Sequence, residues 1–278
     1  MRPLCVVVGL MLAGRAAHAQ SPRAGGPAPG DDPSSRVAVE GALSGNIARG
    51  FVDRELISAR GILQAWSGPL GFYVQPYWLY GRVGTPMGKL TTDNEVYVRT
   101  GVFRALTGPL FAYGVTVYDR SVRRQIEHRN LAGAGLGVTL WQCKGSSLLS
   151  SVGVLHEVAD YGGKLDKAPL LEDGREGGGL RNTARWSIRI YGRYKLADGK
   201  LNLLHDLIVI PSFRDPSDDY RVLFYGAIDA PIAKGFSARI SADATREGLI
   251  VAGTKHDDLA ITFGVAYKNE WPPKPPPK

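Results

Sequence analysis

The residues best suited to chemistry are arginines that recur at every fourth position of RWSIRIYGRYKL, residues 185–196. Arg185, Arg189 and Arg193 share alternate positions with polar residues, while Trp, Ile and Leu occupy most positions between them. This period of two indicates a β-strand with one charged face and one apolar face. A row of guanidinium groups on one face of a strand is suited to attracting anions.

Nucleophilic catalysis on a strand requires a base and a hydroxyl on the same face, as in the spacing His-x-Ser. The histidines beyond residue 19 occur instead in the segments HRN (128–130), HEV (156–158), HDL (205–207) and HDD (256–258). His205 and Asp206 are adjacent, so a strand directs them to opposite faces. Zinc-ligand spacings are missing from the sequence as well. We therefore expect no enzymatic activity, no cofactor and no metal centre.

Twelve alternating segments, most of them ten to fourteen residues long, fill the middle of the chain. We place them at about 37–47, 54–66, 70–83, 94–106, 111–120, 129–142, 148–159, 183–196, 200–213, 220–231, 236–246 and 257–271. Tight turns containing Gly alternate with longer connections, expected near 84–93, 121–128, 160–182, 214–219 and 247–256. This pattern predicts an all-β protein, a single antiparallel transmembrane β-barrel of about twelve strands over residues 37–271.

The two ends of the chain differ from this middle part. Residues 1–19 have a basic start, an apolar stretch and Ala-His-Ala, which is typical of a signal peptide for the Sec pathway. Residues 20–36 predict a disordered periplasmic linker, and residues 272–278 form a Pro/Lys tail. An even number of strands would leave both termini in the periplasm of a protein located in the cell outer membrane.

Charged residues cannot face hydrocarbon, where each would cost about 2–4 kcal/mol near the bilayer midplane. We therefore expect the charged rows to face the lumen, and they comprise Arg60, Arg99, Glu157, Arg185, Arg189, Arg193, Lys195, Asp206, Arg221, Asp229, Arg239 and Asp243. Gly133, Gly135 and Gly137 share the inward row of their strand and leave room for long side chains from elsewhere. The positive excess favours a narrow anion-preferring pore. A salt-bridged lumen that does not conduct fits the same residues.

Aromatic residues near the strand ends predict two girdles at the membrane surfaces. They are Phe72, Trp78, Tyr80, Trp141, Trp186, Tyr194, Phe236, Tyr267 and Trp271. Trp271 ends an alternating aromatic segment of the kind that the barrel-insertion machinery reads.

Acidic residues cluster in two predicted outer connections, FRDPSDDY (213–220) and KHDD (255–258). These acids are Asp215, Asp218, Asp219, Asp257 and Asp258. Their oxygens suit a divalent cation held between lipopolysaccharide phosphates, or they are solvated loop acids. The formal net charge of +8 belongs to an exported chain, so we expect lipid, lipopolysaccharide and small anionic solutes as partners and no nucleic acid.

Several segments together resemble the salt-induced outer-membrane proteins, domain-of-unknown-function family 481. They include GALSGNIARGFVDRELISARGILQAW, NEVYVRTGVFRALTGPLFAYGVTVYDR, HRNLAGAGLGVTLW, RWSIRIYGRYKL, DDYRVLFYGAIDAPIAKGFSARISADATRE and KHDDLAITFGVAYKNEW. The resemblance covers about residues 37–271. It implies an outer-membrane β-barrel of Gram-negative type and no catalytic residues.

Three hypotheses for function follow. The first is an outer-membrane barrel of envelope- or salt-stress type that passes small anions. The second is a non-conducting barrel whose external loops bind lipopolysaccharide or a surface partner. The third, a soluble secreted β-sheet protein that binds a ligand, leaves the apolar rows without a layer to bury them.

Overall fold

The computed structural model describes residues 36–48, 54–85, 88–143, 146–161, 170–174, 176 and 180–271. The predicted signal peptide, nearly all of the linker at 20–36 and the tail at 272–278 lie outside these residues, as does most of the predicted connection at 160–182.

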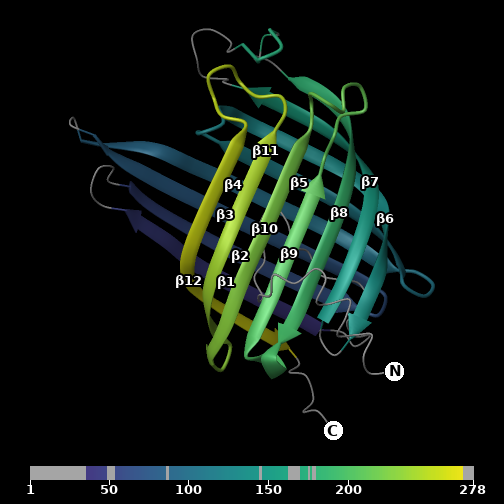
Figure 1. Ribbon diagram of the computed structural model, residues 1–278. Coiled ribbons are helices and arrows are strands. Elements are labelled where there is room, and N and C mark those ends of the chain that lie inside the picture. Colours follow the sequence, from purple (N-terminus) through teal and green to yellow (C-terminus); the bar gives the residue numbers. More distant parts are fainter. Residues whose placement is uncertain are drawn as a thin grey trace.

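The described residues form one closed antiparallel barrel in which each strand pairs with its neighbours in sequence and β1 pairs with β12 (Figure 1). The strands are β1 (Arg36–Ala48), β2 (Arg54–Ser67), β3 (Leu70–Thr85), β4 (Gly88–Ala105), β5 (Leu110–Ser121), β6 (Ile126–Cys143), β7 (Ser146–Tyr161), β8 (Arg181–Leu196), β9 (Leu201–Val209), β10 (Arg221–Ala233), β11 (Phe236–Glu247) and β12 (Asp257–Trp271). The predicted fold, an antiparallel barrel of twelve strands, is confirmed. Among the described residues, no helix is both long and apolar enough to span a membrane.

One end of the barrel carries the tight turns, and we call it the short-turn end. Gly68 and Gly108 occupy equivalent places in the repeated SGP and TGP turns, with φ angles of 56° and 63°. Glycine adopts this left-handed conformation without steric strain. The opposite end, which we call the long-loop end, carries the connections β7–β8, β9–β10 and β11–β12.

The predicted loop at 84–93 is wrong, because all of these residues except 86 and 87, which are not described, belong to β3 and β4. The two strands pair as far as Thr85 and Gly88, whereas β2 pairs with β3 only up to Val83 and β5 pairs with β4 only from Glu95. The hairpin therefore extends beyond its neighbours. Residues 88–91 near its tip are exposed, and Lys89 pairs with Glu55 of β2 over 2.7 Å.

The ninth strand is also shorter than predicted. We expected it at 200–213, but it ends at Val209. Pro211 follows shortly and has no backbone N–H for a strand ladder. Residues 210–220 instead form the β9–β10 connection.

Glycines on the inner face accommodate aromatic rings from the strand alongside. Gly137 lies opposite Phe111, and a Cβ atom there would come within 2.1 Å of the Phe111 Cζ atom. Gly135 lies opposite Tyr113, whose hydroxyl would be 2.7 Å from such a Cβ atom. These glycines leave room for larger side chains, as the sequence predicts.

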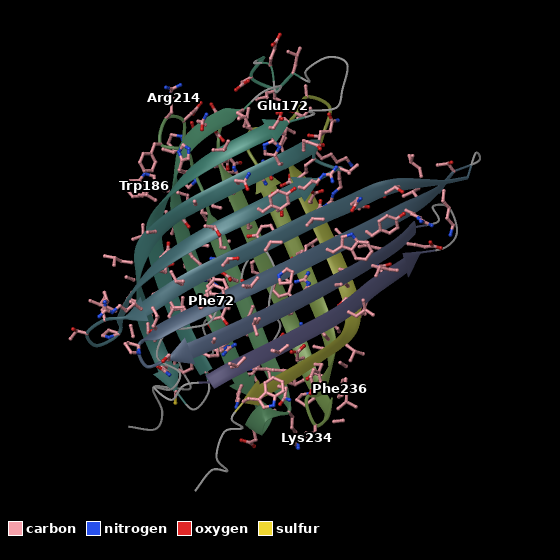
Figure 2. All side chains as sticks on the ribbon, turned by 180° about the vertical axis from the view of Figure 1, so that it is seen from behind. Phe72, Glu172, Trp186, Arg214, Lys234 and Phe236 are labelled. Carbon is pink, nitrogen blue, oxygen red and sulfur yellow. The ribbon has the colours of Figure 1, made fainter. Side chains whose placement is uncertain are left out.

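The outer face of the wall is apolar. Leu43, Leu136, Ile188 and Phe263 are 45–62% exposed, and they alternate with buried or half-buried inward residues. Figure 2 shows Trp186 projecting away from the wall toward the long-loop end, with Phe236 at the opposite end. The chain thus directs one apolar row of each strand outward.

The lumen contains a hydrophobic cluster of its own. Its buried members come from β5 to β10 and the residue after β9, and they are Phe111, Val115, Leu131, Leu149, Leu155, Tyr191, Leu204, Ile208, Ile210, Leu223, Tyr225 and Ala227. We call these residues the lumen cluster. Since they lie on the inward rows, they fill part of the barrel interior with side chains.

Candidate functional site

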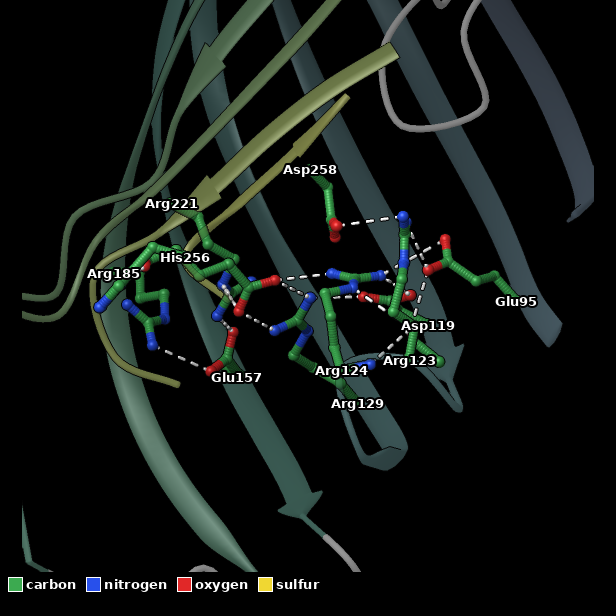
Figure 3. A network of polar contacts seen from close by, with 12 residues as sticks. Glu95, Asp119, Arg123, Arg124, Arg129, Glu157, Arg185, Arg221, His256 and Asp258 are labelled. Carbon is green, nitrogen blue, oxygen red and sulfur yellow. Dashed lines mark hydrogen bonds and ion pairs between the residues drawn. The ribbon is translucent and has the colours of Figure 1, made fainter. Parts of the chain in front are cut away.

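A network of arginines and carboxylates crosses the barrel between the lumen cluster and the long-loop end, and we call it the charged belt (Figure 3). Its members are Glu95, Asp119, Arg123, Arg124, Arg129, Glu157, Arg185, Asp219, Arg221, Glu247 and Asp258. They come from nearly every strand between β4 and β12. The network therefore joins walls that the sequence places far apart.

Glu247, the last residue of β11, joins one wall to the opposite wall. Its carboxylate accepts a hydrogen bond of 2.9 Å from Arg129 of β6 and one of 2.6 Å from Arg124. Arg124 and Arg129 also donate to Asp119 of β5. All four side chains are buried. This part of the belt crosses the lumen from β5 and β6 to β11.

Glu157 of β7 is, like Glu247, a carboxylate on which two arginines of the charged belt converge. It accepts hydrogen bonds from Arg185 of β8, over 3.0 Å, and from Arg221 of β10. Arg185 also donates to the carboxylate of Asp219 over 2.7 Å. Arg221 also lies 3.7 Å from Glu247, so it connects the contacts of Glu157 with those of Glu247.

Arg123 lies in the turn between β5 and β6 and extends the belt to two further strands. Its guanidinium lies 3.1 Å from Glu95 of β4 and 3.0 Å from Asp258 of β12. Burial lowers the pKa of Arg123, but the nearby carboxylates, Glu95 above all, raise it by more, so its pKa lies above the ordinary value.

A hydrophobic group, which we call the apolar cap, lies at the long-loop end. It consists of Ile126, Ala159, Tyr161, Leu171, Leu249 and Val251. Leu171 of the β7–β8 connection forms a β-bridge with Val251 of the β11–β12 connection. His256 lies 2.8 Å from Glu172 and fixes the same two connections to each other. The apolar cap, the charged belt and the lumen cluster thus follow one another along the lumen from the long-loop end.

The predicted lumen residues all lie on inward rows, but they are not one array. Glu157, Arg185 and Arg221 belong to the belt. Elsewhere in the lumen the ion pairs are Arg189 with Asp206, Arg239 with Asp229 and Glu40, and Arg60 with Asp243. Arg193 is half-buried and Lys195 is exposed near the short-turn end. Arg99 is buried, and its guanidinium lies 5.8 Å from the centre of the Tyr73 ring.

Sequence reasoning missed seven charged residues that lie in the lumen, five of them acids. The missed lumen residues are Glu40, Asp93, Glu95, Asp119, Arg124, Arg129 and Glu247. Glu95, Asp119 and Glu247 each lie two residues from another inward residue, so strict alternation carried to the strand ends would have found them. With these acids included, the lumen is much closer to neutral than the predicted rows.

The predicted loop acids lie in different surroundings. Asp219 is buried and accepts hydrogen bonds from Arg181 and Arg185, and Asp258 contacts Arg123. Asp257 pairs with Arg246 at the surface, while Asp215 is half-buried and Asp218 is exposed. Within the described ranges, no group of three or more His, Cys, Asp or Glu residues is arranged to hold a metal ion.

The predicted girdle residues all lie on the outer face, and most of them pair. The ring contacts are Trp78 with Tyr80, Trp141 with Tyr194, Trp186 with Phe213, and Phe236 with Tyr267. Phe72 and Trp271 are 39% and 49% exposed. The hydroxyl of Tyr194 lies 2.9 Å from His205 Nε2, so this histidine also belongs to the outer face.

Three solved structures illustrate what the barrel is similar to. The translocator domain of the autotransporter NalP from Neisseria meningitidis is 14% identical, with 95% of this chain and 92% of that chain covered and a TM-score of 0.45. The NanC porin is 12% identical, with 84% and 99% covered and a TM-score of 0.47. The COG4313 outer membrane channel from Pseudomonas putida F1 is 11% identical, with 89% and 97% covered and a TM-score of 0.44.

The sequence itself gives the firmer assignment. A comparison with curated proteins finds no match. A family model described as "Protein of unknown function, DUF481" matches residues 47–268, which is most of the chain. The chain, as its resemblance suggested, belongs to the DUF481 family.

Proposed function

We propose that this protein is an outer-membrane β-barrel whose lumen is closed to ions in the described conformation and whose long-loop end binds lipopolysaccharide. The observation that carries the proposal is the charged belt, in which Glu247 of β11 holds Arg124 and Arg129 from the far side of the barrel. A role in salt or envelope stress is part of the same proposal.

The outer face supports a membrane location. Trp186, Ile188 and Ile190 are 41–45% exposed on one strand, and a soluble protein would leave this row in water. Hydrocarbon is the favourable environment for such a row, and the aromatic pairs suit the two interfaces. The apolar outer face therefore disfavours a soluble ligand-binding protein.

The position of the chain ends supports an orientation. β1 begins and β12 ends at the short-turn end of the barrel (Figure 1). In outer-membrane barrels the short turns are periplasmic. We propose that both termini are periplasmic, that export follows the Sec pathway, and that the insertion machinery reads the last strand with Trp271.

The proposal of a closed lumen depends on the free energy that an ion would need to enter it. Glu157 and Glu247 are buried and each is held by more than one arginine. Breaking a buried ion pair on one side costs about 3–5 kcal/mol. A permeating ion would have to separate several such pairs and pass two apolar layers. In this proposal the barrel closes with side chains of its own strands and connections.

A hollow at the long-loop end supports the lipopolysaccharide part of the proposal. Its volume is about 680 Å³, and it is lined by Arg181, Asn182, Thr183, Ala184, Ser212, Phe213, Arg214, Asp215 and Asp219. Arg214 is exposed there, directly beside the lipid-facing pair of Phe213 and Trp186 (Figure 2). A cation next to exposed aromatic rings suits the phosphate of a lipid headgroup.

The proposal is tested with protein refolded into liposomes. A closed barrel releases no trapped chloride or small sugar above the rate of empty liposomes. Lipopolysaccharide binding is measured separately, and Arg214→Ala is expected to weaken it several-fold. Lys234→Ala, at the short-turn end, is the matched control that leaves binding unchanged.

The second candidate is a narrow anion-preferring pore. It is favoured by Arg193 and Lys195, which approach the short-turn end and add positive charge there. In this candidate the charged belt is a gate. Release of chloride from the liposomes, but not of potassium, would favour the pore over the closed barrel.

A further inference from the structure

Arg99 of β4 differs from every other buried arginine that the structure describes. Its side chain is inward and the residue is 6% exposed. The atoms Nε and Nη1 are buried and have no hydrogen-bond partner among the described residues. Among the residues that the structure describes, no carboxylate lies within 4.0 Å of the Arg99 guanidinium.

The other buried arginines each have a carboxylate within this distance, and they are Arg60, Arg124, Arg129, Arg185, Arg221 and Arg239. A guanidinium group cannot lose its proton in a protein, so burial cannot neutralise it. An unpaired buried charge is strongly destabilising. Something other than a carboxylate of the described chain therefore compensates Arg99.

The neighbours that the structure offers are weak compensation. The ring of Tyr73 lies 5.8 Å from the guanidinium carbon, near the limit for a cation–π interaction. Asp119 lines the same space, but its carboxylate already accepts hydrogen bonds from Arg124 and Arg129. Neither group gives Arg99 a negative charge that is not already paired with another arginine.

Arg99 lines a cavity inside the barrel, between the charged belt and the lumen cluster. The cavity has a volume of about 40 Å³, measured as the space open to the centre of a water molecule. Space for one water on this measure is about 10–15 Å³, so the cavity holds a small ion with a few waters. Arg124, Arg129 and Arg221 also line it, but each already pairs with a carboxylate. Arg99 and Ser187 therefore supply the remaining donors, while Val115, Leu155 and Ile208 supply apolar walls.

We propose that this cavity holds a small inorganic anion of the size of chloride, bound by the buried guanidinium of Arg99. The anion supplies the negative charge that the chain does not place beside Arg99. The lining suits a weakly hydrated monovalent anion, because most of the wall is apolar and the donors lie on a few side chains. The site is a resident one, and it goes beyond the proposed function because it requires no passage through the lumen.

Thermal unfolding in two salts tests the site. The refolded full barrel is heated in sodium chloride and in sodium gluconate of the same ionic strength, because gluconate is too large for the cavity. The midpoint of the wild-type protein is expected to lie about 2–4 °C higher in chloride. Arg99→Gln is expected to abolish this difference.

Arg189→Gln is the matched control, since Arg189 is also an inward arginine but has its own carboxylate, Asp206. It lowers the midpoint in both salts and keeps the chloride-dependent difference. An equal midpoint in both salts for the wild-type protein overturns the proposal. So does a difference that persists in Arg99→Gln.

A crystallographic measurement keeps the test independent of the refolding of Arg99→Gln. Wild-type crystals grown in bromide are expected to show an anomalous peak in the cavity, in contact with Arg99. An empty or water-filled cavity in those crystals overturns the site.

Discussion

Arg129 on β6 donates to Glu247 on β11 over 2.9 Å, although β7, β8, β9 and β10 separate these two strands around the barrel. Both residues are at most 3% exposed. A pair between neighbouring strands would stiffen the wall and leave the lumen open. This pair spans the lumen instead, so the interior and the wall are stabilised by the same interactions.

Removal of one belt carboxylate should destabilise the barrel strongly. In Glu157→Gln the guanidinium groups of Arg185 and Arg221 lose their shared anion. We expect a loss of about 3–5 kcal/mol, because the remaining charges stay buried. Urea unfolding in a lipid or detergent environment measures this loss.

The control for this prediction is Asp257→Asn, which removes a carboxylate from an exposed pair with Arg246. Exposed pairs contribute about 0–1 kcal/mol. Equal stability losses in the two variants would mean that the belt does not hold the barrel together.

Coupling across the lumen can be measured directly with Arg129→Ala, Glu247→Ala and the double variant. In the double variant Arg124 keeps Asp119, and Arg221 keeps Glu157. We expect the double variant to lose less stability than the sum of the single variants, with a coupling of about 0.5–3 kcal/mol. Additive losses would show that the two strands are not energetically joined.

The packing of rings on glycines gives a prediction for the wall. A Cβ atom at Gly137 would lie 2.1 Å from Phe111 Cζ, so Gly137→Ala forces the ring to move. We expect a loss of about 1–3 kcal/mol from overpacking. At Gly41 the nearest atom would be 3.9 Å away, so Gly41→Ala should leave the unfolding midpoint nearly unchanged.

If the barrel lies in a membrane, the cost of an arginine on its outer face should depend on the depth of that residue in the bilayer. Ile188 lies in the middle of β8 and Ile232 near the end of β10, and both are exposed on the outer face. An arginine at the bilayer midplane costs about 2–4 kcal/mol, and one near the interface about 0–1 kcal/mol. Ile188→Arg should therefore reduce folding into liposomes far more than Ile232→Arg. Similar yields for both would contradict a bilayer around this wall.

Alternation in the sequence was enough to predict the barrel and to place charged rows on the inner face of its strands. Arg185, Arg189 and Arg193 face inward as predicted, because lipid penalises charge on one face only. Strand ends are harder to predict, since the polar hairpin tip around Lys89 shows no alternation and its sequence predicts a loop.

The partners of the lumen residues could not be predicted. Strand order fixes which residues are neighbours along the wall, but it does not say which side chains meet across the interior. Arg129 and Glu247 are 118 positions apart in sequence, and no local pattern links them. The structure was also needed to show that Arg99 has no carboxylate beside it within the described residues.

Single-channel recording in a planar lipid bilayer tests the central claim most directly, with protein refolded without residues 1–19. The account predicts that insertion is detected but that no current steps occur in a potassium chloride gradient. Current steps whose reversal potential shows a preference for anions would contradict the closed lumen. If those steps then disappeared when Arg185, Arg189 and Arg193 were changed to Gln, the anion-preferring pore would replace the closed barrel as the function.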